Sequence, residues 1–157
     1  MFEEDRTKGE TLRTTAARFR RIINKIVRMS QFPQDFGTGE VLPAAEIQII
    51  HTIGVNPGIT VTELSSQLGL TKGTVSPMVN RLVKRGYLGK SKSSEDGRKV
   101  QLRITEKGET AFRGYEEYAE EYVSKYAHEI SYGEWIIVNE TLAKLETFLD
   151  TKMKEGQ

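Results

Sequence analysis

The sequence of 157 residues contains no cysteine. Disulfide bonds, thiolate metal ligands, cysteine nucleophiles and thiol-based redox sensing are therefore excluded together. Long apolar runs are also missing, since the longest is Trp135–Val138, far short of the ~18 residues that a membrane span needs. The beginning, Met1–Asp5, is acidic and lacks the apolar region of a secretory signal, so we expect a cytoplasmic protein that contacts no membrane.

Groups suited to catalysis or metal binding are few. His51 and His128 are the only histidines and lie far apart in the sequence, so a transition-metal site would need carboxylate ligands. An ordinary histidine is the simpler interpretation of each. No Ser/His/Asp set and no pair of carboxylates has the spacing of a catalytic site. We therefore expect neither an enzyme nor a bound metal or cofactor.

The net charge of +1 hides an uneven distribution of charge along the chain. Residues 1–58 are nearly balanced, whereas residues 59–105 carry 9 basic and 3 acidic residues and residues 106–157 carry 6 basic and 12 acidic residues. A basic middle segment predicts that this part of the chain faces a polyanion. Taken alone, the charge pattern fits chance clustering on solvated faces equally well.

Hydrophobic periodicity and turn signals predict a mainly α-helical protein with a small β-hairpin. The expected elements are a helix over residues 11–29, a loop over 30–42, a helix from Pro43 to Asn56, helices over 60–68 and 71–85, extended segments over 87–92 and 99–104 around a turn at 93–98, and two long helices from Thr105 to about Glu129 and from Ser131 onward.

The strongest signal is the segment Thr60–Val83, which has the pattern of a helix-turn-helix. Thr60-x-x-Glu63 is a capping box, and Gly69 can adopt the left-handed conformation that a tight turn requires. Suitable residues for a small core between two crossing helices are Leu64, Ser65, Leu68, Leu70, Val75 and Met78. An ordinary two-helix corner with a solvated outer face is the alternative interpretation.

The second of these helices is expected to expose small hydroxyls, an amide and cations, which are the groups that read base edges and grip phosphates. These residues are Lys72, Gly73, Thr74, Ser76, Pro77, Asn80, Arg81 and Lys84. In the hairpin, Arg98 can enter a narrow minor groove, where negative potential is concentrated, and Asp96 can orient it. The alternative for Asp96 and Arg98 is a surface ion pair worth less than ~1 kcal/mol.

Two stretches carry a resemblance to a known family. Asp96-x-Arg98 followed by Ile104–Thr105-x-x-Gly108, together with Thr71–Ser76, is similar to the MarR family of transcription regulators, with Ile104 where leucine is more usual. The resemblance implies a winged helix-turn-helix DNA-binding domain over residues 40–105 and a helical dimerisation region over residues 1–39 and 106–157. It implies a homodimer that binds double-stranded DNA at a pseudo-palindromic operator, with repression favoured over activation.

Under this resemblance the predicted DNA contacts form three groups. The residues expected in the major groove are Thr71, Lys72, Gly73, Thr74, Ser76, Pro77, Asn80 and Arg81. The residues expected on the phosphate backbone are Lys84, Lys90, Lys92 and Lys99. In the minor groove we expect the wing residues Asp96 and Arg98.

The aromatic stripe from Phe112 to Tyr126 has helical spacing, which favours a dimer core. The resemblance also implies a pocket for a small-molecule effector, and its candidate lining residues are Phe19, Ile23, His51, Phe112 and Tyr115. Pro77 within the second helix resembles the organic-peroxide-sensing branch of the family. Because that branch senses with a cysteine and this chain has none, Pro77 is not evidence of peroxide sensing.

Two other functions stay open. A winged helix can also serve as a module that binds protein or RNA without operator specificity, but the polar, basic face from Lys72 to Lys84 is unlike the apolar face that protein binding requires. A small-molecule-binding or enzymatic helical bundle is the second rival, and no cluster of titratable residues supports it.

Overall fold

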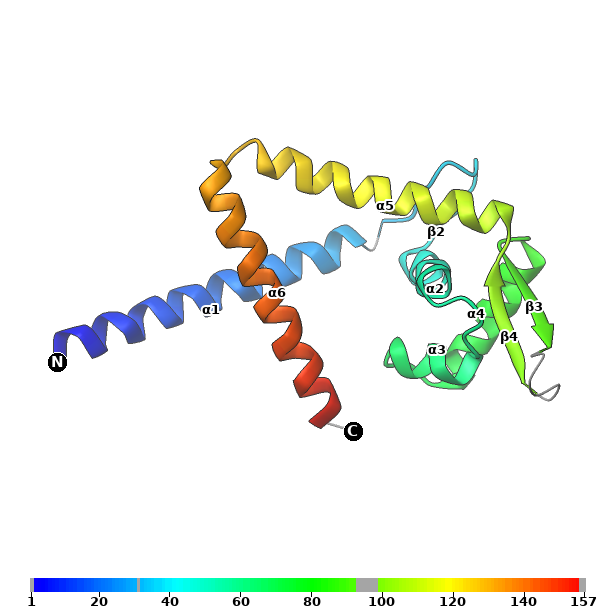
Figure 1. The fold of residues 1–157 in the computed structure, drawn as a ribbon, viewed down its shortest axis with the longest axis horizontal. Coiled ribbons are helices and arrows are strands. Elements are labelled where there is room, and N and C mark those ends of the chain that lie inside the picture. Colours follow the sequence, from blue (N-terminus) through cyan, green and yellow to red (C-terminus); the bar gives the residue numbers. More distant parts are fainter. Residues whose placement is uncertain (1, 31, 93–98, 156–157) are drawn as a thin grey trace. The chain divides into compact units, whose positions relative to one another are not determined.

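The computed structural model describes residues 2–30, 32–92 and 99–155. Over these residues it has six helices and two antiparallel two-stranded sheets, so the predicted fold class, mainly α with a hairpin wing, is confirmed (Figure 1). The elements are α1 (Phe2–Ser30), β1 (Gln34–Asp35), β2 (Val41–Leu42), α2 (Ala44–Val55), α3 (Val61–Gln67), α4 (Lys72–Lys84), β3 (Leu88–Lys92), β4 (Val100–Ile104), α5 (Glu106–Ala127) and α6 (Tyr132–Glu155). The chain divides into two compact units, residues 1–115 and 116–157.

The core of the first unit lies between α2, α3, α4 and the β3–β4 hairpin. The isoleucines of α2 are all buried, as the spacing of Ile47, Ile50 and Ile53 predicts. The remaining fully buried side chains include Leu64, Val75, Val79, Leu82, Tyr87 and Leu102. Met78, which was predicted to face this core, is half-buried, and its neighbour Val79 is fully buried.

The helix-turn-helix forms largely as its local signals predict. The side chain of Thr60 accepts a hydrogen bond from the backbone N–H of Glu63, and the Glu63 carboxylate accepts one from the N–H of Thr60, which completes the capping box. Gly69 has a φ of +64°, the left-handed conformation expected of the turn. Leu70 was predicted to fill the space between the helices, but its side chain is 42% exposed, so this expectation is wrong. Leu64 and the half-buried Leu68 occupy the interior instead.

Two segments differ from the sequence prediction. α1 begins at Phe2 rather than near residue 11, because residues 2–10 are rich in good helix formers. The predicted loop over residues 30–42 contains the short β1–β2 pair, closed by a turn in which Asp35 accepts hydrogen bonds from the N–H groups of Thr38 and Gly39. This turn therefore holds the chain directly before α2.

The wing is anchored to the helices at its base. β3 and β4 pair from Leu88 opposite Ile104 to Lys92 opposite Val100. The segment before α3 also pairs with β4, since Gly58 N–H donates to the carbonyl of Leu102 and the N–H of Leu102 donates to the carbonyl of Ile59. The hairpin is thus bound on one side to the helix-turn-helix that it accompanies.

The second unit consists of the later part of α5 and α6. The rings of Tyr118 and Tyr122 lie 4.9 Å apart along α5. The predicted capping box at the start of α6 is confirmed, because Ser131 and Glu134 exchange hydrogen bonds. The hydroxyl and N–H of Ser131 lower the pKa of the Glu134 carboxyl.

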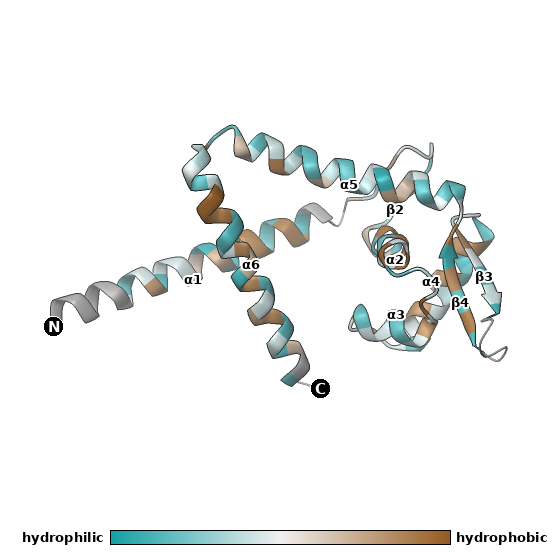
Figure 2. Ribbon diagram, viewed as in Figure 1, coloured by the Kyte–Doolittle hydropathy of each residue, from teal (hydrophilic) through white to brown (hydrophobic). Residues whose placement is uncertain are grey.

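Large apolar side chains are exposed along α1 and α6, seen as brown stretches on each of these helices in Figure 2. They include Leu12, Phe19, Ile22, Ile23 and Ile26 on α1, and Ile136, Ile137, Leu142, Phe148 and Leu149 on α6. Despite these residues, none of the helices in the described part of the chain is both long and apolar enough to cross a bilayer.

Candidate nucleic-acid interface

The outer face of α4 is polar and open to solvent. The helix begins at a cap formed by Thr71, whose hydroxyl accepts the N–H of Thr74, and it continues through Pro77 without a break. The exposed residues predicted to contact DNA on this helix are Thr71, Lys72, Gly73, Thr74, Pro77, Asn80, Arg81 and Lys84. Ser76 is half-buried, which leaves its hydroxyl less open than those of its neighbours.

One flank of this face is joined to the wing. The Nζ of Lys90, on β3, donates a hydrogen bond of 2.7 Å to the Oδ1 of Asn80. Because an ammonium group only donates, the atom of Asn80 that faces it is the amide oxygen, and the amide nitrogen keeps its two donors. Asn80 is therefore presented as a hydrogen-bond donor.

The other flank is joined to α2. The Nε of Arg81 donates a hydrogen bond of 2.7 Å to the Oε1 of Glu46, whose side chain is 4% exposed, while the Arg81 side chain is 58% exposed. The second oxygen of Glu46 accepts a hydrogen bond of 2.5 Å from Nη1 of Arg85. Each oxygen of this buried carboxylate thus faces a guanidinium, as a buried charge requires.

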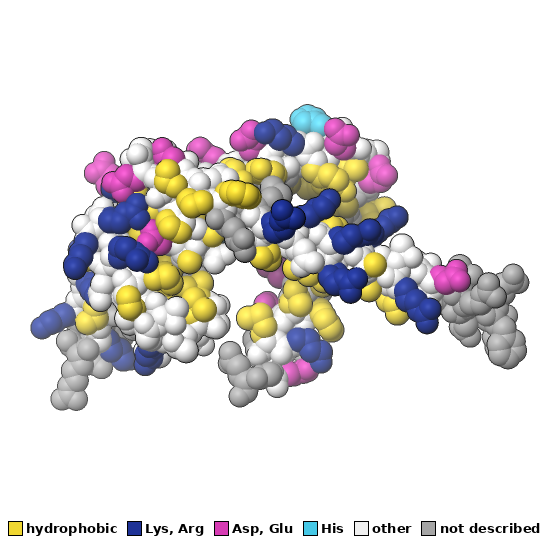
Figure 3. Space-filling view, turned by 180° about the vertical axis from the view of Figure 1, so that it is seen from behind, with side chains coloured by type: hydrophobic (Ala, Val, Ile, Leu, Met, Phe, Trp, Pro, Cys, Tyr) yellow, Lys and Arg dark blue, Asp and Glu magenta, His cyan; other side chains and the backbone are white. Residues whose placement is uncertain are grey.

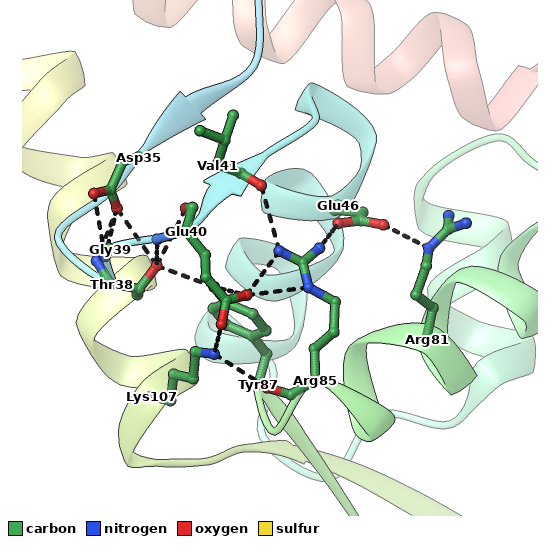
Figure 4. A network of polar contacts seen from close by, with 10 residues as sticks. All are labelled: Asp35, Thr38, Gly39, Glu40, Val41, Glu46, Arg81, Arg85, Tyr87 and Lys107. Carbon is green, nitrogen blue, oxygen red and sulfur yellow. Dashed lines mark hydrogen bonds and ion pairs between the residues drawn. The ribbon is translucent and has the colours of Figure 1, made fainter.

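The contacts of Glu46 extend into a network that joins the segment before α2 to the start of α5 (Figure 4). Glu40 accepts hydrogen bonds from Nη2 of Arg85 at 3.0 Å and from Nζ of Lys107 at 2.5 Å. Lys107, followed by Arg85, holds the pKa of the Glu40 carboxyl below its usual value, and Glu40 raises the pKa of Lys107. Both cations also lie over the ring of the buried Tyr87, at 5.2 Å for Arg85 and 4.4 Å for Lys107.

Sequence reasoning did not single out Glu40, Glu46, Arg85 or Lys107. A signal was present for Glu46, because it is the only acidic or basic residue other than a histidine in an otherwise apolar or uncharged helix. A lone carboxylate in such a helix is rarely buried unless a cation pairs with it. The identity of that cation depends on the tertiary structure.

The wing carries exposed cations next to α4. Lys90, Lys92 and Lys99 are all exposed, and Lys and Arg side chains gather at the lower left of Figure 3, on the side that carries β3 and β4. Asp96 and Arg98, the two residues predicted to enter the minor groove, lie outside the described residues.

Three of the five candidate pocket residues come together. The ring of His51, on α2, lies 5.3 Å from that of Phe112 and 5.3 Å from that of Tyr115, both on α5. The two others, Phe19 and Ile23 of α1, are 44% and 43% exposed. As for metals, the described residues contain no group of three or more His, Asp or Glu side chains that could hold an ion.

The family model described as the MarR family matches residues 42–100. Among curated proteins, the chain is 30% identical over 74 residues to an uncharacterized HTH-type transcriptional regulator, YhjH of Bacillus subtilis, which covers 47% of this chain and 42% of that protein. It is 38% identical over 50 residues to the organic hydroperoxide resistance transcriptional regulator of Bacillus subtilis, covering 32% of this chain and 34% of that protein. The chain spans less than half the length of the curated relatives that it matches.

Solved structures match over more of the chain. FabT of Streptococcus pneumoniae, solved in complex with DNA, is 25% identical with a TM-score of 0.74, over 88% of this chain and 97% of that one. A MarR family protein from Bacillus stearothermophilus has the same fold, with a TM-score of 0.78 at 18% identity, over 90% of this chain and 96% of that one. Residues 42–100, which include the helix-turn-helix and most of the residues of the hairpin wing, thus match the MarR family, and the solved structures show that the fold is similar to that of MarR family proteins.

Proposed function

We propose that this protein is a transcription regulator that binds double-stranded DNA in a sequence-specific manner. The observation that carries the proposal is the exposed polar face of α4, which is capped at its start, seated on a helix-turn-helix and flanked by the cations of the wing. Such a face provides both hydrogen-bonding groups for base edges and charges for phosphates. FabT, a protein of similar fold and 25% identity solved in complex with DNA, supports this assignment.

In the proposed complex, residues 40–105 form the DNA-binding domain and α4 enters the major groove. Thr74, Ser76, Asn80 and Arg81 read base edges, Lys84, Lys90, Lys92 and Lys99 contact phosphates, and Arg98, oriented by Asp96, enters the minor groove. The proposal includes the cytoplasmic location that the sequence led us to expect, where the regulator would reach its DNA.

We propose further that the protein acts as a homodimer, with residues 1–39 and 106–157 forming the dimerisation region. The apolar side chains exposed along α1 and α6 support this, because a single chain leaves them in water. Two winged helices related by two-fold symmetry would occupy half-sites about one helical turn, ~10 bp, apart on a pseudo-palindromic operator. Occupation of an operator would then repress transcription.

A small-molecule effector is the remaining part of the proposal. The rings of His51, Phe112 and Tyr115 pack against one another and join α2 to α5, and we propose that a small-molecule effector binds beside them. A ligand there, with Phe19 and Ile23 as further lining residues, would release the operator by changing the spacing of the two recognition helices.

Selection of bound fragments from random duplex DNA tests the proposal. We expect a two-fold symmetric consensus with half-sites about 10 bp apart, and affinity that falls steeply as salt increases. Retention of RNA, or of DNA without any enriched sequence, would instead favour a winged-helix interaction module and would contradict the regulator.

A further inference from the structure

The buried carboxylate of Glu46 holds one side of Arg81 and leaves the other side open. Only Nε of Arg81 contacts Glu46 in the described part of the chain, and Figure 4 shows the two terminal nitrogens facing away from it. The Arg81 side chain is 58% exposed even though its partner is 4% exposed. The guanidinium is therefore anchored at its base while its terminal nitrogens are available to a ligand.

The anchor itself is held in place. Arg85 donates from Nη1 to the second oxygen of Glu46, and its own position is set by hydrogen bonds to Glu40 and to the carbonyl of Val41. With both oxygens engaged, the Glu46 carboxylate has little freedom to rotate. The orientation of the Arg81 guanidinium is restrained in turn, since its Nε–H points along the hydrogen bond to Glu46.

We propose that Glu46 is a positioning residue for DNA reading, and that it presents the terminal nitrogens of Arg81 as a fork for the O6 and N7 acceptors of one guanine in each half-site. This proposal rests on the proposed function. It adds a preference for guanine and a role for Glu46, a residue that does not itself contact DNA. A fork of two donors matches the two acceptors of guanine in the major groove, and no other base offers that pair. Holding the fork beforehand lowers the entropy that binding would otherwise remove from a long side chain.

The charges of the network are compatible with this role. Arg81, Arg85 and Lys107 supply three positive charges, against the two negative charges of Glu40 and Glu46. The group retains one net positive charge, so Glu46 directs Arg81 without cancelling its attraction to DNA. Direct competition between Glu46 and the DNA is avoided because Glu46 uses Nε and guanine would use the terminal nitrogens.

The experiment compares Glu46→Gln, Arg81→Ala and their double variant on the selected operator and on operators with each guanine replaced. Glu46→Gln keeps the shape of the side chain but removes the charge that attracts Nε. We expect Glu46→Gln to lose about tenfold in discrimination at the same guanine as Arg81→Ala, with little change on random DNA. The double variant is expected to lose no more than Arg81→Ala alone.

Glu40→Gln is the matched control, because Glu40 contacts Arg85 and Lys107 and makes no contact with Arg81 among the described residues. It weakens the same network at a residue further from Arg81, so it should lose less discrimination at that guanine than Glu46→Gln. Equal loss of discrimination in Glu40→Gln and Glu46→Gln would show a general effect on folding and would overturn the positioning role. If Glu46→Gln does not fold, Glu46→Asp retains the charge but retracts it, and undiminished discrimination in that variant would also overturn the role.

The two levels of the proposal fail in different ways. Loss of discrimination in Arg81→Ala with none in Glu46→Gln leaves the regulator and the base contact standing and rejects the role of Glu46. Unchanged discrimination in Arg81→Ala rejects the guanine contact and the role of Glu46 together. Absence of any specific site for the unaltered protein rejects the proposed function itself.

Discussion

Asn80 and Arg81 are neighbours in the sequence, yet each is held by a different element of the fold. Asn80 is bonded to Lys90 on β3, and Arg81 is bonded to Glu46 on α2. Both partners use one polar atom of the recognition residue and leave donors exposed. Under the proposed function, these exposed donors suit guanine, which presents two acceptors (N7 and O6), better than adenine, which presents one acceptor (N7) and one donor (N6).

Lys84 differs from these two residues because its exposed ammonium group has no partner among the described residues. We predict that Lys84→Ala weakens specific and random DNA alike and lowers the slope of log affinity against log salt by about 0.9, the value for one phosphate contact. Filter binding or fluorescence anisotropy across a salt series measures the slope.

The control for this prediction is Lys144→Ala, which removes an exposed cation of α6 from the other compact unit. Its slope should equal that of the unaltered protein. An unchanged slope for Lys84→Ala would show that Lys84 does not contact a phosphate.

At the scale of elements, the start of α5 is packed tightly against the turn between α4 and β3. The hydroxyl of Thr105 donates to the carbonyl of Gly86 and accepts the N–H of Gly108. A Cβ added at Gly108 would lie 2.2 Å from the carbonyl oxygen of Tyr87. This explains in physical terms why threonine and glycine stand at these positions of the Thr105-x-x-Gly108 motif.

We predict that Gly108→Ala destabilises the protein by about 1–3 kcal/mol, because the backbone of Tyr87 must move to admit a methyl group. Urea unfolding followed by circular dichroism measures the change. Gly133→Ala in α6 is the matched control, since an added Cβ there meets nothing within 4 Å and should be neutral or stabilising by up to about 1 kcal/mol. A stability for Gly108→Ala equal to that of the unaltered protein would contradict the close packing.

The Glu40 network ties the segment before α2 to α4 and α5, and its contribution to stability should depend on pH. Because the pKa of Glu40 is lowered in the folded protein from its usual 4.5, the folded state binds a proton less readily than the unfolded chain. The stabilisation is thus complete above the unfolded pKa and is lost as the pH falls through the folded pKa.

We predict that unaltered protein exceeds Glu40→Gln in urea midpoint at neutral pH, and that this difference shrinks as the solution is acidified below about pH 4.5. Parallel urea titrations of the two proteins across the acid range provide the measurement. A difference that persists undiminished at the acid limit would mean that ionised Glu40 does not stabilise the fold.

For the molecule as a whole, the large apolar side chains exposed on α1 and α6 would be buried in the proposed homodimer. We predict that deletion of residues 131–157 abolishes the homodimer and with it tight operator binding, because binding two half-sites at once requires two linked winged helices. Light scattering gives the mass and anisotropy the affinity, with circular dichroism to verify that the shortened chain is folded. A folded monomer that still binds the operator tightly would reject this architecture.

Features that depend on residues three or four positions apart could be predicted from the sequence. The capping boxes at Thr60 and Ser131, the turn at Gly69 and the buried face of α2 are of this kind, because helix geometry alone brings their partners together. The polar face of α4 follows from the same periodicity.

The ion pairs and hydrogen bonds between residues far apart in the sequence could not be predicted in this way. Glu46 and Arg81 are 35 positions apart, and Glu40 and Lys107 are 67 apart. The exposure of Leu70 and the orientation of Asn80 were likewise decided only by the tertiary structure. The physical reason is that these contacts depend on how α2, α4, α5 and the wing pack, and local periodicity carries no information about which of the available cations a buried carboxylate will meet.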